Sequence, residues 1–566
     1  MNRRRSIFAL LTPVLLLTGL AGEPSFAAPA TDVLARVHWL GLDRVSADSN
    51  SAHFMSVWRL PQTTALLDQT LDKFSRWPAG GATNAAGPLL RPLLNDLVSS
   101  ESYWELRASS NSQPSTLNPQ LSFALAVRLP ADRARLWQTS LANALADLTG
   151  VHPVSVPNGW LLRQSHAPEQ VEFYRAGEWT FVGWGPDTTN LLPPFADRIA
   201  RDNMPPSTTD VWLEADLDPL RLADIFSLSA AGGKVPSPAG AGEGARRAVE
   251  GSGDETKFDG RGEVGSLNIS TLNPQLSTLN HLHLTATGEG GNVVTRGTLE
   301  FSRPLNLSLP PWEIPTNLIL QPLISFSAVR GIAPWLAAMP AWQKLGLAPP
   351  PDQMYCWAED GIPFQTYFAA PLPAASNQLW QLAGRLVQTA NPWLATNGEG
   401  SFQWAINPPC LVWNDALLIS PYLLPVTVNQ HDYVLGGLYP RAGGNPSPMP
   451  VEILRAILNT TNLIYYQTEQ TGFHVEDRFF ITQLFRVVFH KAQLPAAAAA
   501  TVWLKKAEPL LGASTTIMTQ TGPAQLNFAR QSTVGLNALE LHLLADWLES
   551  PQFPHGLHTF LAPPDQ

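Results

Sequence analysis

The stretch Leu129-Pro130-Ala131, with Leu136-Trp137-Gln138 after it, decides the fold because it recurs in the second half of the chain. The second copy reads Leu372-Pro373-Ala374 and then Leu379-Trp380-Gln381, with the same internal spacing. An apolar run typical of a strand precedes each copy, at residues 123–127 and 365–370. Leucine and tryptophan at this spacing indicate a helix face directed into a core. Each half is therefore predicted to contain a strand followed by a packed helix.

The other predicted elements follow the same order in both halves. Each half opens with a strand and a helix, passes through the recurring stretch, and then reaches a strand that leads into a helix and a polar hairpin. The first-half segments are 54–58, 63–74, 179–183, 211–215 and 220–226; those of the second half are 324–329, 334–345, 416–420, 433–438 and 451–458. This order predicts an α+β fold of two tandem related modules, each with helices packed on a mainly antiparallel sheet.

The first residues have the pattern of a cleavable signal peptide. Arg3, Arg4 and Arg5 precede an apolar run at residues 7–20, and Ser25-Phe26-Ala27 fits the small-x-small cleavage rule. The pattern predicts an exported protein, periplasmic or extracellular; an uncleaved membrane anchor is the alternative. No later stretch is long and apolar enough to span a bilayer, so we expect no transmembrane span after the signal peptide.

The chain divides into segments of distinct composition. We expect a signal peptide at 1–27, an N-terminal segment at 28–50, a first module at 51–310, a Pro-rich junction at 311–321, a second module at 322–550 and a tail at 551–566. The octapeptide at 115–122 recurs at 270–277 and fits an expanded DNA repeat. It marks a loop insertion at 109–122, at the tip of a hairpin, and the end of a disordered insertion at 230–280 that is rich in Gly and Ser.

Composition and the absence of known motifs reduce the number of function classes that fit this chain. The formal charge is −10 and no basic block follows the signal peptide, so we expect no nucleic-acid partner. The chain has no Gly-x-Ser-x-Gly elbow, His-Glu-x-x-His helix or phosphate-binding loop, and we expect no cofactor. An acid–base pair can still be assembled from distant segments.

Glu214, Asp216 and Asp218 are the first group of candidate site residues. Strand alternation places these carboxylates and Trp212 on one face, where they could hold Ca²⁺ or supply acid–base groups. The alternative is a solvated strand face, with Asp218 capping a helix that begins at Pro219.

His281 and His283 form a second group, a same-face pair that could contribute to a zinc site if further ligands came from elsewhere. The alternative is an exposed pair beside the insertion.

Cys356 and Cys410 either form one disulfide or remain free buried thiols. Of the 19 tryptophans, those in helical runs are expected in the core, among them Trp137, Trp335 and Trp380. Trp184 and Trp393 are freer to be exposed.

The signal peptide, the duplicated pattern with its Leu-Pro-Ala and Leu-Trp-Gln pairs, and the octapeptide insertions resemble the large uncharacterised exported proteins of environmental bacteria. The resemblance implies no activity and no site residues. Our leading hypothesis is a non-enzymatic binding or structural protein of the cell envelope, with an envelope component or another protein as partner. The alternatives are a polymer-acting (carbohydrate) hydrolase that uses carboxylates such as Glu214 and Asp216, and a metal-binding module at the acidic or His-x-His segments.

Overall fold

A computed structural model describes most of the chain between residues 33 and 554. The residues outside the description are 1–32, 77–85, 109–120, 165–168, 187, 202–209, 223–277, 361–364, 398–399, 416–418, 440–446, 489–494, 551–552 and 555–566. The predicted signal peptide lies outside the described residues, as do most of both predicted insertions and of the predicted tail.

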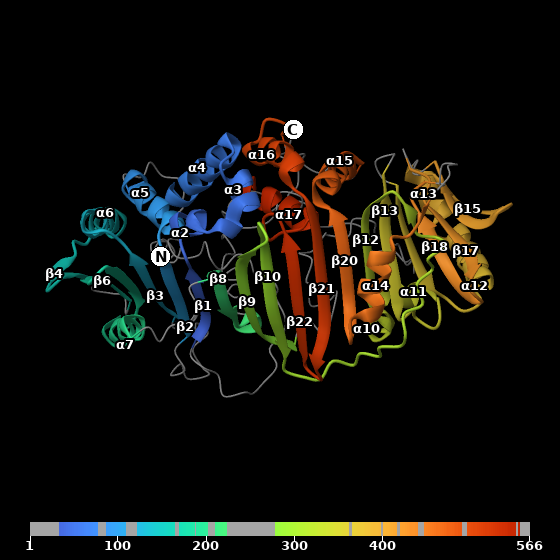
Figure 1. The fold of residues 1–566 in the computed structure, drawn as a ribbon. Helices are drawn as coiled ribbons and strands as arrows, with labels where there is room; N and C mark the ends of the chain where they lie inside the picture. Colours follow the sequence, from blue (N-terminus) through green and yellow to red (C-terminus); the bar gives the residue numbers. More distant parts are fainter. Residues whose placement is uncertain are drawn as a thin grey trace, which may run out of the picture.

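The protein has an α+β fold whose strands form one antiparallel sheet of 20 strands (Figure 1). The first-half strands are β1 (Val33–Trp39), β2 (Ser102–Ala108), β3 (Leu121–Arg128), β4 (Val154–Val156), β5 (Gly159–Arg163), β6 (Gln170–Ala176), β7 (Trp179–Gly185), β8 (Val211–Leu217), β9 (Leu279–Glu289) and β10 (Asn292–Phe301). The second-half strands are β12 (Leu323–Arg330), β13 (Gln353–Glu359), β14 (Thr366–Pro371), β15 (Ser401–Ile406), β16 (Pro409–Asn414), β17 (Tyr422–Val428), β18 (His431–Gly437), β20 (Leu463–Gln470), β21 (Ala513–Gly522) and β22 (Gln525–Ser532). A separate two-stranded sheet pairs β11 (Leu320–Gln321) with β19 (Ser447–Pro448).

The strand order reads the same outward from the middle of the large sheet. Starting at the β10–β22 pair, one side runs β10-β9-β8-β1-β2-β3-β7-β6-β5-β4. The other side runs β22-β21-β20-β12-β13-β14-β18-β17-β16-β15. At the junction, Thr298 pairs with Asn527 and Gly297 with Phe528. The two halves are therefore hydrogen-bonded to each other through strands.

Helices pack mainly on one face of this sheet, which we call the first face (Figure 1). Those of the first half are α2 (Leu42–Ala47), α3 (Ala52–Trp58), α4 (Pro61–Arg76), α5 (Ala86–Ser99), α6 (Ala131–Thr149) and α7 (Thr188–Ala200). Those of the second half are α10 (Ala333–Ala338), α11 (Pro340–Leu345), α12 (Ala375–Thr389), α13 (Asn391–Asn397), α14 (Val451–Asn459), α15 (Thr471–Val488), α16 (Ala499–Ala507) and α17 (Ala538–Leu548).

The core lies on both faces toward the ends of the sheet, but mainly on the first face at its centre. On the first face, α5 and α6 pack with alternate residues of β3 such as Phe123 and Leu125, while α4, α16 and α17 share a second cluster. On the opposite face, which we call the second face, α7 covers Ala124 and Ala126 of β3. There α14 packs with Phe326 and other residues of β12 and β13.

Between α7 and α14, the second face carries polar side chains on the two strands that join the halves. These residues, which we call the central strip, are Arg296, Thr298 and Glu300 of β10 and Gln525, Asn527 and Gln531 of β22. Each is half-exposed or exposed. Among the described residues, no hydrophobic cluster includes a member of the strip. The sheet therefore has one polar face across its middle, as antiparallel sheets often do.

Two predicted elements were wrong and one strand was missed. Residues 54–58 form part of helix α3, although their short apolar run was interpreted as a strand. The true opening strand is β1, in the segment that the sequence analysis placed before the first module; it lies between β2 and β8. The predicted helix at 334–345 is two short helices that meet at Pro340, because proline lacks the amide hydrogen that would continue the first one.

The recurring Leu-Trp-Gln stretch does not place its two tryptophans alike. Trp137 is buried, 3% exposed, and its Nε1 donates to Asp96 of α5 at 2.8 Å. Trp380 is 61% exposed, so its predicted core position is wrong. Helix α12 begins one residue later in its copy than α6 does, after Ala374 in the left-handed region (φ 51°), and its buried face contains Leu379 in place of Trp380.

The other tryptophan predictions had mixed outcomes. Trp393 is 50% exposed, as expected, whereas Trp184 is only 6% exposed because it lies in the interior strand β7, so that prediction is wrong. Trp335 is half-buried on α10.

Among the described helices, none combines the length and apolar character needed to cross a bilayer.

Candidate functional site

The two groups of candidate residues meet on the second face of the sheet. Glu214 and Asp216 lie on β8, and His281 and His283 lie on β9, which pairs with β8 in antiparallel register. Asp216 is directly opposite His283 in this pairing. The acidic segment and the His-x-His segment, considered separately in the sequence, therefore form one cluster.

Asp216 is the centre of the contacts in this cluster. Its Oδ1 lies 2.9 Å from Nδ1 of His283 and 3.4 Å from Nε2 of His281. The other ring nitrogen of His283, Nε2, lies 3.7 Å from Oε1 of Glu214. One possible ligand atom from each of Glu214, Asp216 and His283 falls within 4.8 Å of the others. The arrangement can hold a cation or share protons.

Burial and hydrogen bonding move the pKa values of the cluster in different directions. Burial raises the pKa of Glu214, and the nearby Asp216 carboxylate adds to this effect. Burial alone would raise the pKa of Asp216 too, but hydrogen bonds from His281 and His283 outweigh it and the net pKa is lowered. The hydrogen bond to Asp216 raises the pKa of His281. Asp216 is therefore held as an anion between two imidazoles.

Asp218 has a different role from the other two carboxylates. Its Oδ1 accepts a hydrogen bond from the backbone N–H of Arg221 at 3.0 Å, as expected of a residue that caps the helical turn beginning at Pro219. Trp212, which was predicted to share the carboxylate face, does not. It is buried in a cluster with Val45 of α2, because a register shift in β8 at this point breaks the strand alternation.

His38, which was not among the predicted site residues, lies on β1 directly opposite Glu214. His38 is 5% exposed, stacks on Tyr103 with ring centroids 4.3 Å apart, and has Nε2 3.1 Å from Oε1 of Glu101. Its Nδ1 is buried without a hydrogen-bond partner, and so is Oε2 of Glu214. The alternation of β1 could have revealed His38, but that segment was placed outside the modules.

Glu105 of β2 is a buried carboxylate on the same face of the sheet as the cluster. Its side chain is fully buried and contacts Arg36 of β1 at 2.9 Å, Arg198 of α7 at 2.8 Å, and Arg107. Burial would raise the pKa of Glu105, but the three guanidinium groups outweigh it and lower the pKa. These ion pairs tie α7 to the sheet and suggest a structural role for Glu105.

The two cysteines are free thiols in this fold. Cys356 lies on β13 and Cys410 on β16, four strand positions apart in the sheet. At about 4.8 Å per strand this is roughly 19 Å, far beyond the reach of a disulfide. The disulfide alternative is therefore wrong. Burial raises the pKa of Cys356 to about 11 and also raises that of Cys410, which makes both thiols poor nucleophiles.

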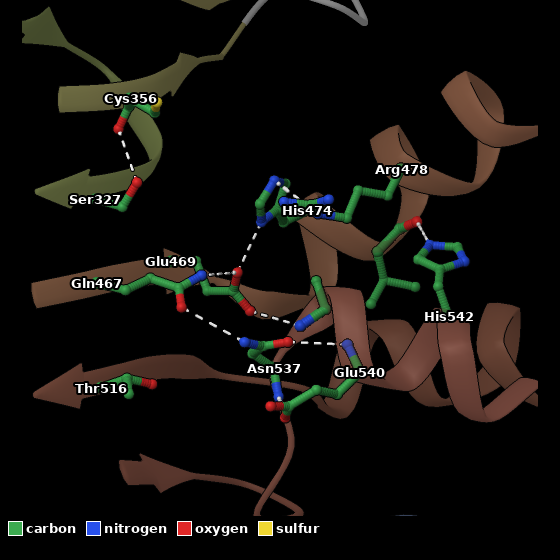
Figure 2. A network of polar contacts seen from close by, with 12 residues as sticks. Ser327, Cys356, Gln467, Glu469, His474, Arg478, Thr516, Asn537, Glu540 and His542 are labelled. Atoms are coloured by element: carbon green, nitrogen blue, oxygen red, sulfur yellow. Dashed lines mark hydrogen bonds and ion pairs between the residues drawn. The ribbon is translucent and has the colours of Figure 1, made fainter. Parts of the chain in front are cut away.

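A second polar network lies in the other half, buried under α15 and α17 on the first face (Figure 2). Glu469 at the end of β20 accepts hydrogen bonds from the backbone N–H of Ala538 at 2.7 Å and from Gln467 at 3.1 Å. Its Oε2 is also 2.7 Å from Nδ1 of His474, whose Nε2 accepts from Nε of Arg478 at 3.1 Å. Because Arg478 donates to Nε2, the proton of a neutral His474 lies on Nδ1 and is donated to Glu469.

This buried network has the character of a structural connection. The Glu469 side chain is 0% exposed, and hydrogen bonds from His474 and Ala538 help to lower its pKa against the opposing effect of burial. Asn537 extends the network as the N-cap of α17, in a capping box with Glu540. The carboxylate and the imidazole both have hydrogen-bond partners within the protein. These partners lie on different elements, so the network joins β20, α15 and α17.

A shallow cleft of about 450 Å³ lies at the outer end of the first half. It is lined by residues of α7 and of the strands β4, β6 and β7, among them Glu172, Tyr174, Trp179 and Asp197. Glu214 and Asp216 do not line it, so this cleft offers no polymer-binding groove at the predicted carboxylate pair.

Comparisons with known proteins identify no family. No family model matches the chain and no curated protein matches it. A solved structure described as crystal form III of TP0453 aligns at 8% sequence identity over 54% of this chain and 88% of that chain, with a TM-score of 0.22. A likeness of this size supports neither a fold assignment nor a function.

Proposed function

We propose that this chain is an exported, non-enzymatic binding protein of the cell envelope, built from two related copies of one α+β module. The observation that supports the proposal is the strand order, in which each half contributes ten strands in the same sequence outward from the β10–β22 pair. An unrelated pair of domains has no reason to repeat a ten-strand order. The recurring Leu-Pro-Ala and Leu-Trp-Gln stretches fall at matching places, after β3 and after β14.

The binding surface in this proposal is the central strip. It belongs equally to both halves, because Thr298 of β10 donates to the side chain of Asn527 of β22 at 3.1 Å and Gln525 donates to Glu300 at 3.2 Å. A partner that docks there contacts both copies of the module at once. The strip is polar and carries both Arg296 and Glu300, which favours a hydrogen-bonding partner over an apolar one.

The hydrolase alternative has less support. A polymer-acting enzyme needs its carboxylates in a groove that holds the chain on both sides of the scissile bond. Glu214 and Asp216 lie on a sheet face, and the described cleft is elsewhere. A binding role therefore explains more of the described surface.

Site-specific photo-crosslinking in cells that produce the protein tests this proposal. One variant carries a photoreactive amino acid at Gln531, an exposed member of the central strip, and a matched variant carries it at Arg135, which is exposed on α6. The proposal predicts discrete adducts with an envelope component from Gln531 and none from Arg135. An absence of adducts at Gln531, or equal adducts at both positions, would contradict it.

A further inference from the structure

We propose that the cluster on β8 and β9 is a binding site for one divalent transition-metal ion, of which Zn²⁺ is the representative, with Glu214 and His283 as ligands. This site adjoins the central strip, because His283 pairs with Thr298 of β10, but the proposal does not depend on the proposed function. The site combines the acidic segment and the His-x-His segment, which the sequence offered as two separate metal-binding hypotheses.

The donor atoms select the class of metal. An imidazole nitrogen combined with carboxylate oxygens suits Zn²⁺ and similar ions, whereas Ca²⁺ and Mg²⁺ prefer oxygen ligands throughout. Here one imidazole and two carboxylates place their possible ligand atoms within 4.8 Å of one another. We therefore expect Zn²⁺ to bind well and Mg²⁺ poorly.

The spacing of Glu214 and His283 is close to what such an ion requires. Bonds of about 2.1 Å at a tetrahedral angle separate two ligand atoms by about 3.4 Å. Oε1 of Glu214 and Nε2 of His283 are 3.7 Å apart. A movement of a few tenths of an ångström would bring both side chains to bonding distance, because Glu214 has rotatable bonds beyond its Cβ.

Asp216 prepares His283 for this role. It accepts a hydrogen bond from Nδ1 of His283 at 2.9 Å, which fixes the tautomer and leaves the lone pair on Nε2, toward Glu214. A carboxylate that holds the far nitrogen of an imidazole ligand is a recurring feature of zinc sites, where it orients the ring and makes it more basic.

His38 repeats this arrangement on the other side of Glu214. Glu101 holds its Nε2 at 3.1 Å, as Asp216 holds Nδ1 of His283, and the remaining nitrogen of His38 is buried without a partner. Oε2 of Glu214, on the residue directly opposite, is buried without a partner too. Two unsatisfied buried polar atoms on facing residues are costly. An ion that Glu214 holds through both carboxylate oxygens removes that cost for Oε2, and the unpartnered nitrogen of His38 lies on the adjacent strand β1.

Among the described residues, the second half has no such cluster at the matching place, so we expect one ion per chain. The strands that correspond to β8 and β9 in the sheet order are β20 and β21. On their second face, Tyr466 and Ile517 belong to or pack against the hydrophobic cluster under α14, and Thr468 lies opposite Phe326. None of these three residues is a Cys, His, Asp or Glu, the residue types that bind Zn²⁺ in proteins.

Isothermal titration of the whole chain, purified without a polyhistidine tag, with ZnCl₂ tests the site. The expected result is one Zn²⁺ per chain, with affinity at least tenfold weaker in both Glu214→Gln and His283→Gln. The matched control is His431→Gln, because His431 lies in the second half, beside a carboxylate as His283 does, with Nδ1 3.3 Å from Oε2 of Glu313. This control should bind Zn²⁺ as the unaltered chain does.

Circular dichroism of each variant separates a lost site from a lost fold. His283 has a side chain that is 34% exposed, so its replacement should leave the fold intact. The proposal is overturned if the unaltered chain shows no Zn²⁺ binding, if a folded His283→Gln binds with unchanged affinity, or if His431→Gln weakens binding as much as His283→Gln does.

Discussion

Replacing Glu469 by glutamine should loosen the buried network of the second half. The substitution keeps the size of the side chain but removes its charge, and one carboxylate oxygen becomes an amide group that only donates. Glu469 now accepts three hydrogen bonds, from Ala538, Gln467 and His474, and no part of its side chain is exposed. At least one donor would lose its acceptor, and the nearby Arg478 guanidinium would lose its buried counter-charge.

The size of the effect follows from these contacts. Leaving a buried hydrogen-bond donor without its acceptor costs about 1–3 kcal/mol, because the donor stays desolvated. The local opening free energy of β20 and α17 should fall by that amount. Since about 1.4 kcal/mol corresponds to a factor of ten, amide hydrogens of these elements should exchange roughly 5- to 140-fold faster.

Hydrogen exchange followed by mass spectrometry measures this directly, in peptides that cover residues 463–470 and 537–548. The matched control is Glu178→Gln, since Glu178 also pairs with an arginine, Arg128 at 2.7 Å, but is 70% exposed. An exposed pair contributes only about 0–1 kcal/mol. Equal exchange in Glu469→Gln and Glu178→Gln would refute the view that the network joins β20 to α17.

The remaining predictions concern acid stability, the thiols and the junction of the halves. Glu105 has a folded pKa below its ordinary value of 4.5, so its stabilisation is present above that pH and is lost as the pH falls through the folded pKa; the urea midpoint should fall between pH 5 and pH 3, and less steeply in Glu105→Gln. Cys356 and Cys410 should resist alkylation at pH 7.5 in the folded chain, and both should react in denaturant without reductant; a mass unchanged under those denaturing conditions would contradict free thiols. Gly297→Ala should lower stability by about 1–3 kcal/mol through overpacking, because a Cβ there would lie 2.1 Å from the Phe528 ring; an unchanged thermal midpoint would show that the β10–β22 junction tolerates the methyl group.

Local pattern was sufficient for most of the regular elements. The apolar run at residues 123–127 and the strand pattern at residues 211–215 correctly predicted β3 and β8, and the helical spacing in residues 63–74 predicted α4. It failed at residues 54–58, where a short apolar run fits a strand and a helix equally well, and packing against the sheet selected the helix.

Most residues of the candidate site could also be predicted from the sequence. Strand alternation correctly placed Glu214 with Asp216, and His281 with His283, on shared faces of their strands. These are properties of single segments, and they follow from the two-residue period of any extended chain. By contrast, the absence of a disulfide between the two cysteines could not be inferred from their spacing along the chain.

Tertiary pairing decided how these segments meet. Only the antiparallel register of β8 with β9 places Asp216 opposite His283, and only the pairing of β1 with β8 places His38 opposite Glu214. A shift of one residue in either register would move the whole set of side chains to the other face. Register is set by the packing of the buried face against helices, which involves residues far away in the chain. Local sequence therefore specifies which side chains share a strand face, and the assembled sheet specifies which faces form a site.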